Sequence, residues 1–166
     1  MKRLYAPWRT AYTKQEKKQG SGSDSCVFCS QLSTNSDDEF FIIKRYDHCA
    51  LMLNLFPYNA GHLLMVPYQH GATLQDLPEN VQASCMKYIA HTTHIVTHVL
   101  QPEGFNIGIN IGKAGGASIV SHVHIHILPR WFGDTNFLPT LTDTKQISVD
   151  LLETFKLLKS AFNNSI

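Results

Sequence analysis

The sequence has few of the features that place a protein in a membrane, outside the cell or on nucleic acid. No apolar run is long enough to cross a bilayer, and the first residues lack the apolar core of a secretory signal. With 14 Lys and Arg against 13 Asp and Glu, the formal net charge of +1 argues against a large nucleic-acid surface. We therefore expect a cytoplasmic protein without a membrane or nucleic-acid partner, in which a local arrangement of groups binds any anionic ligand.

Cysteine is also scarce, and its spacing indicates no disulfide framework. Of the four cysteines only Cys26 and Cys29 are close in sequence, so a reducing compartment is the default. The length of 166 residues fits one compact domain. Residues 14–25 are polar and rich in Gly and Ser, which predicts a flexible linker. We therefore divide the chain into an N-terminal arm and flexible linker (1–25) and a single domain (26–166).

Hydrophobic periodicity predicts short strands, one long helix and a C-terminal helix. The strands are expected at residues 39–45, 49–53, 62–66, 105–111 and 120–128, and the helices at 78–100 and 147–162. Residues 30–38 are polar and are expected to form a loop. Strands joined as hairpins with only two helices indicate an α+β fold with an antiparallel sheet of about five strands.

The strand expected at residues 120–128 carries histidine at every second position. His122, His124 and His126 should share one face, because alternate side chains of a strand point the same way. The apolar residues between them suit a core. A neutral imidazole is a competent nucleophile near pH 7, but His-x-His is also a common pair of metal ligands. The histidines alone support attack on phosphorus and metal binding equally.

A glycine-rich loop before the three histidines favours phosphorus chemistry over metal binding. Asn110–Ser118 reads NIGKAGGAS, and glycines let backbone N–H groups approach phosphate oxygens. Ser118 adds a hydroxyl donor. Beyond the strand, Trp131 has two interpretations: its ring binds substrate by stacking on a nucleotide base, or it is a core or dimer-interface aromatic.

Cys26 and Cys29 form a CxxC motif, which in a reducing compartment indicates zinc binding or redox chemistry. A redox pair would be expected in a thioredoxin-like βαβ setting, and no βαβ alternation is present. Zinc is therefore favoured. Because the sequence has no second CxxC, the other ligands must come from distant parts of the chain.

These motifs resemble those of the histidine-triad (HIT) superfamily over roughly residues 26–130. The likeness is carried by HVHIHIL at 122–128, by Asn54 with Gly61–His62, and by the NIGKAGGAS loop. It implies a HIT-like fold in which the middle histidine, His124, is the nucleophile. His62 and His122 would orient His124, and His126 would contact the scissile phosphate.

The same resemblance implies the substrate and metal ligands. Asn54 would hold the ribose, and the phosphates or leaving group would be held by Asn110, Gly116, Ala117 and Ser118. Some bacterial members carry a structural zinc, which implies the ligands Cys26, Cys29, His70 and His122. No organic cofactor is implied.

Within the superfamily, the chain most resembles the diadenosine tetraphosphate phosphorylases of the mycobacterial type. The arm LYAPWRTAY, the NIGKAGGAS loop and PRWFGDTNF after the triad carry this likeness, although Ala117 stands where that subgroup has a second loop glycine. It implies a homodimer that cleaves dinucleoside polyphosphates through a nucleotidyl-histidine, either by phosphorolysis to ADP and ATP or by hydrolysis. The alternatives are a nucleoside phosphoramidase or nucleotide hydrolase with water as the acceptor, and a non-catalytic nucleotide-binding regulatory module.

Overall fold

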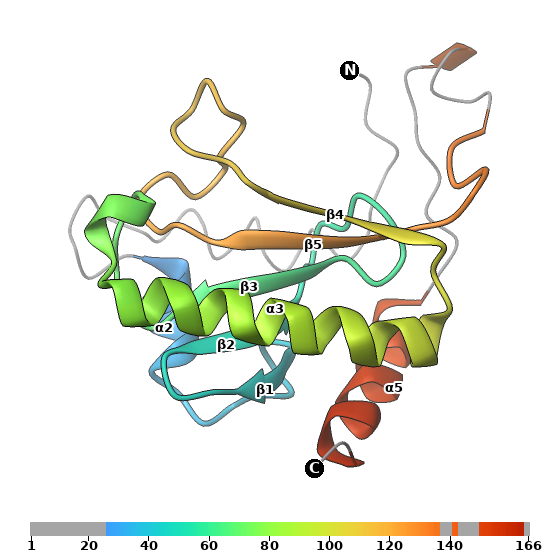
Figure 1. Ribbon diagram of the computed structural model, residues 1–166, viewed down its shortest axis with the longest axis horizontal. Coiled ribbons are helices and arrows are strands. Elements are labelled where there is room, and N and C mark those ends of the chain that lie inside the picture. The colour runs from blue at the N-terminus through green and yellow to red at the C-terminus, as the bar shows by residue number, and fades with distance from the viewer. Residues whose placement is uncertain (1–25, 137–140, 143–149, 165–166) are drawn as a thin grey trace.

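The structure is a computed structural model that describes residues 26–136, 141–142 and 150–164 (Figure 1). The arm and linker expected at 1–25 and the start of the C-terminal helix expected at 147–149 lie outside the described residues. The elements in chain order are α2 (Val27–Leu32), β1 (Ile42–Arg45), β2 (Cys49–Leu53), β3 (Leu63–Pro67), the 3-10 helix η2 (Leu74–Asp76), α3 (Glu79–Leu100), β4 (Gly104–Ile109), β5 (Ile125–Arg130) and α5 (Leu151–Asn164).

The five strands form one antiparallel sheet in the order β1-β2-β3-β5-β4. The predicted α+β fold, with about five antiparallel strands, one long helix and a C-terminal helix, is confirmed. Figure 1 shows α3 crossing one face of the sheet. The apolar stripe of α3 faces the core and includes Val81, Cys85, Ile89 and Val96. None of the described helices is both long and apolar enough to span a bilayer.

β2 and β3 are buried along their whole length because helices cover both faces of this part of the sheet. Alternate residues of the two strands pack with α3 and α5 in one apolar cluster: Cys49, Leu51, Leu53, Leu63 and Met65. The residues between them pack with α2 in a second cluster: Ala50, Met52, Leu64 and Val66. His126 pairs with Leu64, so its side chain lies on the α2 face of the sheet. The α2 face of the sheet therefore carries the candidate site residue His126.

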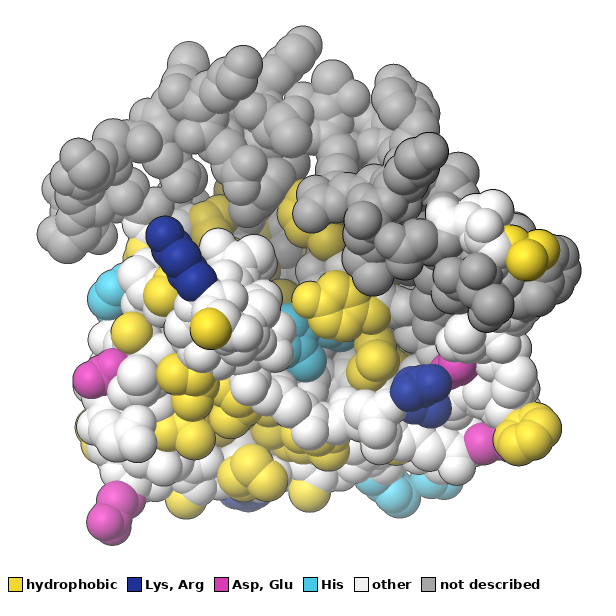
Figure 2. Space-filling view, turned by 90° about the horizontal axis from the view of Figure 1, so that it is seen from above, with side chains coloured by type: hydrophobic (Ala, Val, Ile, Leu, Met, Phe, Trp, Pro, Cys, Tyr) yellow, Lys and Arg dark blue, Asp and Glu magenta, His cyan; other side chains and the backbone are white. Residues whose placement is uncertain are grey.

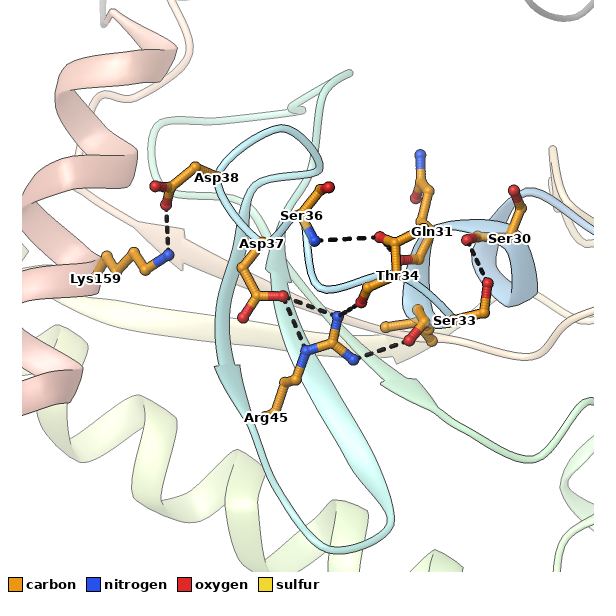
Figure 3. Close-up of polar contacts among 10 residues, drawn as sticks. Ser30, Gln31, Ser33, Thr34, Ser36, Asp37, Asp38, Arg45 and Lys159 are labelled. Carbon is orange, nitrogen blue, oxygen red and sulfur yellow. Dashed lines mark hydrogen bonds and ion pairs between the residues drawn. The ribbon is translucent and has the colours of Figure 1, made fainter.

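Helix α2 was not predicted, because a polar loop was expected from residue 30 onward. Phe28 and Leu32 are buried one turn apart and anchor the helix to the second cluster. Figure 3 shows how Arg45 closes its C-terminal end: the guanidinium donates to the Leu32 carbonyl (2.9 Å), the Thr34 carbonyl (2.7 Å) and the Asp37 carboxylate (2.9 Å). Carbonyls at a helix end need such partners. These bonds fix the C-terminal end of α2 to β1.

The prediction that all three histidines lie on a strand at 120–128 was wrong. β5 begins at Ile125, so only His126 lies in the sheet. Pairing with β3 stops at Ile125 because Pro67, farther along β3, has no N–H to donate. The Pro67 carbonyl instead lies 2.9 Å from Nε2 of the His122 ring. β5 also continues past residue 128, through Pro129, since this part of β5 pairs with the edge strand β4.

Smaller differences affect the other predicted boundaries. β1 begins at residue 42 rather than 39, because the backbone N–H groups of Glu39 and Phe40 donate to the Ser36 carbonyl in turns. Phe41 then has a φ of 56°, which interrupts an extended strand. β4 spans 104–109 rather than 105–111, and β3 and α3 begin one residue later than predicted.

Candidate active site and metal centre

His62 is fully buried, and its two ring nitrogens have different partners. The backbone N–H of Tyr58 donates to His62 Nδ1 (3.0 Å), and the amide nitrogen of Asn54 lies 3.2 Å from the same atom. Nδ1 is therefore the acceptor and Nε2 carries the hydrogen. His62 Nε2–H donates in turn to His126 Nδ1 (2.9 Å), so the hydrogen of His126 is on Nε2. That Nε2–H has no hydrogen-bond partner among the described residues, which makes it available to a ligand.

His124 is held in the tautomer that a nucleophile needs. Its Nδ1 lies 2.9 Å from the carbonyl oxygen of His122, and since a carbonyl only accepts, Nδ1 carries the hydrogen and Nε2 the lone pair. The ring is buried and lies 5.0 Å from the ring of Phe28, centroid to centroid. Burial lowers the pKa of His124 below its usual 6.5. The imidazole is therefore neutral near pH 7, and Nε2 can attack an electrophilic phosphorus.

Four side chains with metal-binding atoms meet beside the triad: Cys26, Cys29, His70 and His122. Their ligand atoms all lie within 4.8 Å of one another. Nδ1 of His122 is 3.2 Å from Sγ of Cys26, and Sγ of Cys29 is 3.3 Å from Nδ1 of His70. A tetrahedral zinc has bonds of about 2.0–2.3 Å to nitrogen and sulfur, which requires ligand separations of this size. The cluster therefore has the donors and the spacing of a structural zinc site.

The hydrogen-bonding of His122 also fits a metal ligand. Nε2–H of its ring donates to the Pro67 carbonyl, so the lone pair is on Nδ1, the atom that faces the two thiols. Metal-binding histidines in proteins are usually oriented by such a bond from the other ring nitrogen. Burial and the neighbouring Cys26 thiol raise the pKa of Cys29 to about 11. A zinc ion bound here would favour the thiolate of Cys29 over its thiol.

The glycine-rich loop uses two of its backbone donors internally. The N–H of Gly116 donates to the Lys113 carbonyl (3.0 Å), and the N–H of Ala117 donates to the Gly112 carbonyl (3.2 Å). These two groups, which were expected to bind phosphate, are directed into the loop. Gly116 has a φ of 86°, which favours glycine, whereas Ala117 is not in the left-handed region. Alanine at position 117 therefore causes no backbone strain.

A pocket of about 160 Å³ opens beside His126. Figure 2 shows histidine side chains recessed in a hollow bordered by hydrophobic side chains. The pocket is lined by Tyr58, Asn106, Ile107, Gly108, Asn110, His126 and Leu128. The predicted Asn110 is among them, but Tyr58 and Asn106 were not found from the sequence. Only the pairing of β4 with β5, which sets Gly108 opposite His126, shows that β4 forms a wall of the site.

The other predicted substrate residues are not among those that line this pocket: Asn54, Gly116, Ala117, Ser118 and Trp131. The indole Nε1–H of Trp131 donates to the Gln101 carbonyl (3.1 Å), at the C-terminal end of α3. The ring is half-buried there. Ser118 is exposed after the glycines of the loop. Stacking of a base on Trp131 and a phosphate contact from Ser118 stay predictions.

The stability of the fold should depend on pH through the buried histidine pair. Burial, with a smaller effect of neighbouring histidines, lowers the pKa of His62 to about 3 and that of His126 to about 4. Between those values and 6.5 the unfolded chain binds protons that the folded chain does not, so the free energy of unfolding should fall as pH falls. For His62 alone we expect a loss of about 2 kcal/mol between pH 7 and pH 5.

Urea unfolding at pH 7 and pH 5 measures this difference. His62→Asn should reduce it, whereas His98→Asn, on an exposed part of α3, should leave it unchanged. An equal pH difference in the wild type and in His62→Asn would contradict the assignment of the effect to this pair.

Known proteins of similar sequence belong to one family. The HIT domain matches residues 35–133 of the chain. The chain is 33% identical over 161 residues to the AP-4-A phosphorylase of Mycobacterium tuberculosis, covering 95% of this chain and 83% of that protein. It is 31% identical over 109 residues to the adenylylsulfatase HINT3 of Arabidopsis thaliana, covering 64% of this chain and 53% of that protein.

Solved structures of similar fold point to the same family. A Zn-bound histidine triad family protein from Mycobacterium smegmatis has a TM-score of 0.70 at 30% identity, covering 86% of this chain and 96% of that one. A hypothetical histidine triad nucleotide-binding protein from Sulfolobus tokodaii has a TM-score of 0.67 at 26% identity, covering 84% of this chain and 93% of that one. The sequence match spans well over half of the chain, and the fold agrees with it. The chain belongs to the HIT family.

Proposed function

We propose that this protein transfers a nucleotidyl group through a covalent intermediate on His124 and that its substrate is a dinucleoside polyphosphate, with diadenosine tetraphosphate favoured. The observation that carries the proposal is the tautomer of His124, with Nδ1–H bound to the His122 carbonyl and the lone pair on Nε2. The similarity to a protein named AP-4-A phosphorylase supports the substrate class.

In the first half-reaction, His124 Nε2 forms a bond to the phosphorus of an adenylyl group. The bond from that phosphorus to the bridging oxygen breaks, and its electron pair leaves with the oxygen of ATP. His126 Nε2–H donates a hydrogen bond to the departing oxygen. The His122 carbonyl stabilises the positive charge that develops on the His124 ring through its bond to Nδ1–H. Asn54 would hold the ribose from its place beside His62.

In the second half-reaction, an acceptor oxygen forms a bond to the same phosphorus. The bond from phosphorus to Nε2 breaks, and its electron pair returns to His124. Phosphate as the acceptor gives ADP, so the overall products are ADP and ATP. Water as the acceptor gives AMP, and that alternative is supported by 26% identity to the adenosine 5'-monophosphoramidase HNT1 of Candida albicans.

Product analysis with and without inorganic phosphate should separate these acceptors. With diadenosine tetraphosphate and phosphate we expect ADP and ATP in equal amounts. Without phosphate, turnover should fall at least about tenfold, which corresponds to about 1.4 kcal/mol in the barrier. AMP formation at a rate independent of phosphate would instead identify a hydrolase. Tight nucleotide binding with negligible turnover under both conditions would identify a regulatory module.

We also propose that Cys26, Cys29, His70 and His122 hold one structural zinc. A bound zinc would join α2, the segment after β3 and the segment before β5, and would fix the backbone whose carbonyl orients His124. The four cysteines are free of disulfides, in keeping with the reducing cytoplasm that we propose for this protein. A homodimeric assembly is proposed from the family resemblance.

A further inference from the structure

The pocket beside His126 offers hydrogen-bond donors and no carboxylate. None of the described residues that line it is acidic. His126 presents a buried Nε2–H that has no partner among the residues the structure describes. A buried donor without a partner costs free energy, so a ligand rich in acceptors would be stabilised here. A phosphate group, whose oxygens accept several hydrogen bonds, is such a ligand.

Arg130 fixes the orientation of the amide of Asn106 on the opposite wall of this pocket. Nη1 of Arg130 donates to Oδ1 of Asn106 at 2.5 Å. A guanidinium has no acceptor, so the amide oxygen must face it and the two N–H groups of Nδ2 are left for a ligand. Asn106 and Gly108 pair with Leu128 and His126 of β5, so both lie on the face of the sheet that carries His126.

An ion pair between the half-exposed Arg130 and the buried carboxylate of Asp134 joins the two walls of the pocket. The Asp134 side chain is 6% exposed and accepts from Arg130 Nε at 2.6 Å. The same carboxylate oxygen accepts from the Asn59 amide at 2.7 Å. Asn59 directly follows Tyr58, whose ring is stacked at 5.8 Å on the ring of His126. Asp134 and Arg130 therefore hold the β4 wall and the loop wall in one hydrogen-bonded unit.

We propose that this pocket is the subsite of the acceptor phosphate, with Asn106 Nδ2 and His126 Nε2 as donors and with Arg130 and Asp134 as positioning residues. An oxygen of the inorganic phosphate bound in the pocket forms a bond to the adenylyl phosphorus, in line with the bond from that phosphorus to Nε2 of His124. The latter bond breaks, and its electron pair returns to His124. Water does not need these donors, so the subsite favours phosphate over water. The inference depends on the proposed function, because it concerns the second half of that reaction.

Two variants test the subsite in the full chain. Asn106→Leu removes the amide at similar size, and Gly108→Val adds a side chain on the pocket face at a position where a Cβ meets no atom within 4 Å. Initial rates with diadenosine tetraphosphate and phosphate give a separate kcat/KM for each substrate. We expect both variants to lower kcat/KM for phosphate at least about tenfold, because Asn106→Leu removes a hydrogen bond to a charged group and the Gly108→Val side chain occupies space in the pocket. Asn163→Leu, exposed on α5, is the matched control.

The outcomes distinguish free phosphate from the phosphates of the leaving group. A loss confined to kcat/KM for the dinucleotide would show that the pocket holds the leaving polyphosphate and would overturn the acceptor assignment. Unchanged kcat/KM for phosphate in both variants would overturn it as well.

A double-mutant cycle tests the positioning role of Asp134. Asp134→Asn should lower kcat/KM for phosphate in the wild-type background and add little in the Asn106→Leu background, because the two changes act through the same amide. Fully additive losses would mean that Asp134 acts independently of the Asn106 amide and would refute its positioning role.

The subsite can also be tested if the proposed function fails. Should the wild type show no phosphate-dependent turnover, titration with inorganic phosphate alone, followed by ³¹P NMR, measures binding directly. Binding to the wild type that Asn106→Leu weakens would support the subsite. No binding, or binding insensitive to both pocket variants, would refute it.

Discussion

His124→Asn should reduce turnover of diadenosine tetraphosphate by about 10⁴-fold or more, as expected when the nucleophile of a covalent mechanism is lost. Nε2 of His124 has a lone pair and a fixed orientation, because its Nδ1–H is bound to the His122 carbonyl. An asparagine amide can still donate to that carbonyl, so the fold should survive the change. Steady-state rates and thermal unfolding of the same preparations measure the two effects.

A trapped intermediate gives a second readout of the same prediction. Phosphoramidates persist in base, so an alkaline quench during turnover followed by mass spectrometry should find an adenylyl group on His124 in the wild type. The His124→Asn variant should carry none, and His98→Asn, at an exposed position of α3, should behave as the wild type. An adduct on His126, or full activity in His124→Asn, would refute the mechanism.

The sequence alone was sufficient to predict the features that depend on local periodicity. The stripe from Val81 to Val96 predicted α3 correctly because apolar residues recur with the helical period. The alternation of His122, His124 and His126 pointed to the candidate active segment even though only His126 lies in a strand. Alternate residues of an extended segment share a side whether or not it pairs in a sheet. The motif could therefore be found from the sequence although the predicted strand boundary was wrong.

Features that depend on contacts between distant segments were not predictable. β5 starts at Ile125 because its partner β3 ends in a proline, and nothing in residues 120–124 records that. Asn106 lies in an ordinary edge strand, and its importance follows only from its pairing with β5 and its bond to Arg130. α2 is too short for a helical period to appear in its sequence, and the buried side chains of Phe28 and Leu32 account for it.

Loss of the proposed zinc should have the second large effect, on stability. Cys26→Ser should remove about one zinc per chain, because a four-ligand site that loses one thiolate binds zinc far more weakly. The zinc would crosslink segments about 40 and 90 residues apart in sequence, as the Cys29–His70 and Cys29–His122 contacts show. Removing such a crosslink should cost about 3 kcal/mol or more. That corresponds to a fall of about 10 °C in Tm for a chain of this size.

Elemental analysis and thermal unfolding, with and without a chelator, measure both effects. Cys49→Ser is the matched control: Cys49 is fully buried in the core, so its change should destabilise the fold while leaving the zinc content unchanged. A wild type purified without chelators that contains no zinc, or a Cys26→Ser variant that retains it, would refute the site.

The activity of Cys26→Ser separates two roles of the metal. Because the cluster is linked to the nucleophile through the carbonyl of His122, loss of a structural zinc should lower kcat only partly at a temperature where the variant is folded, whereas loss of a catalytic metal would abolish turnover as completely as His124→Asn.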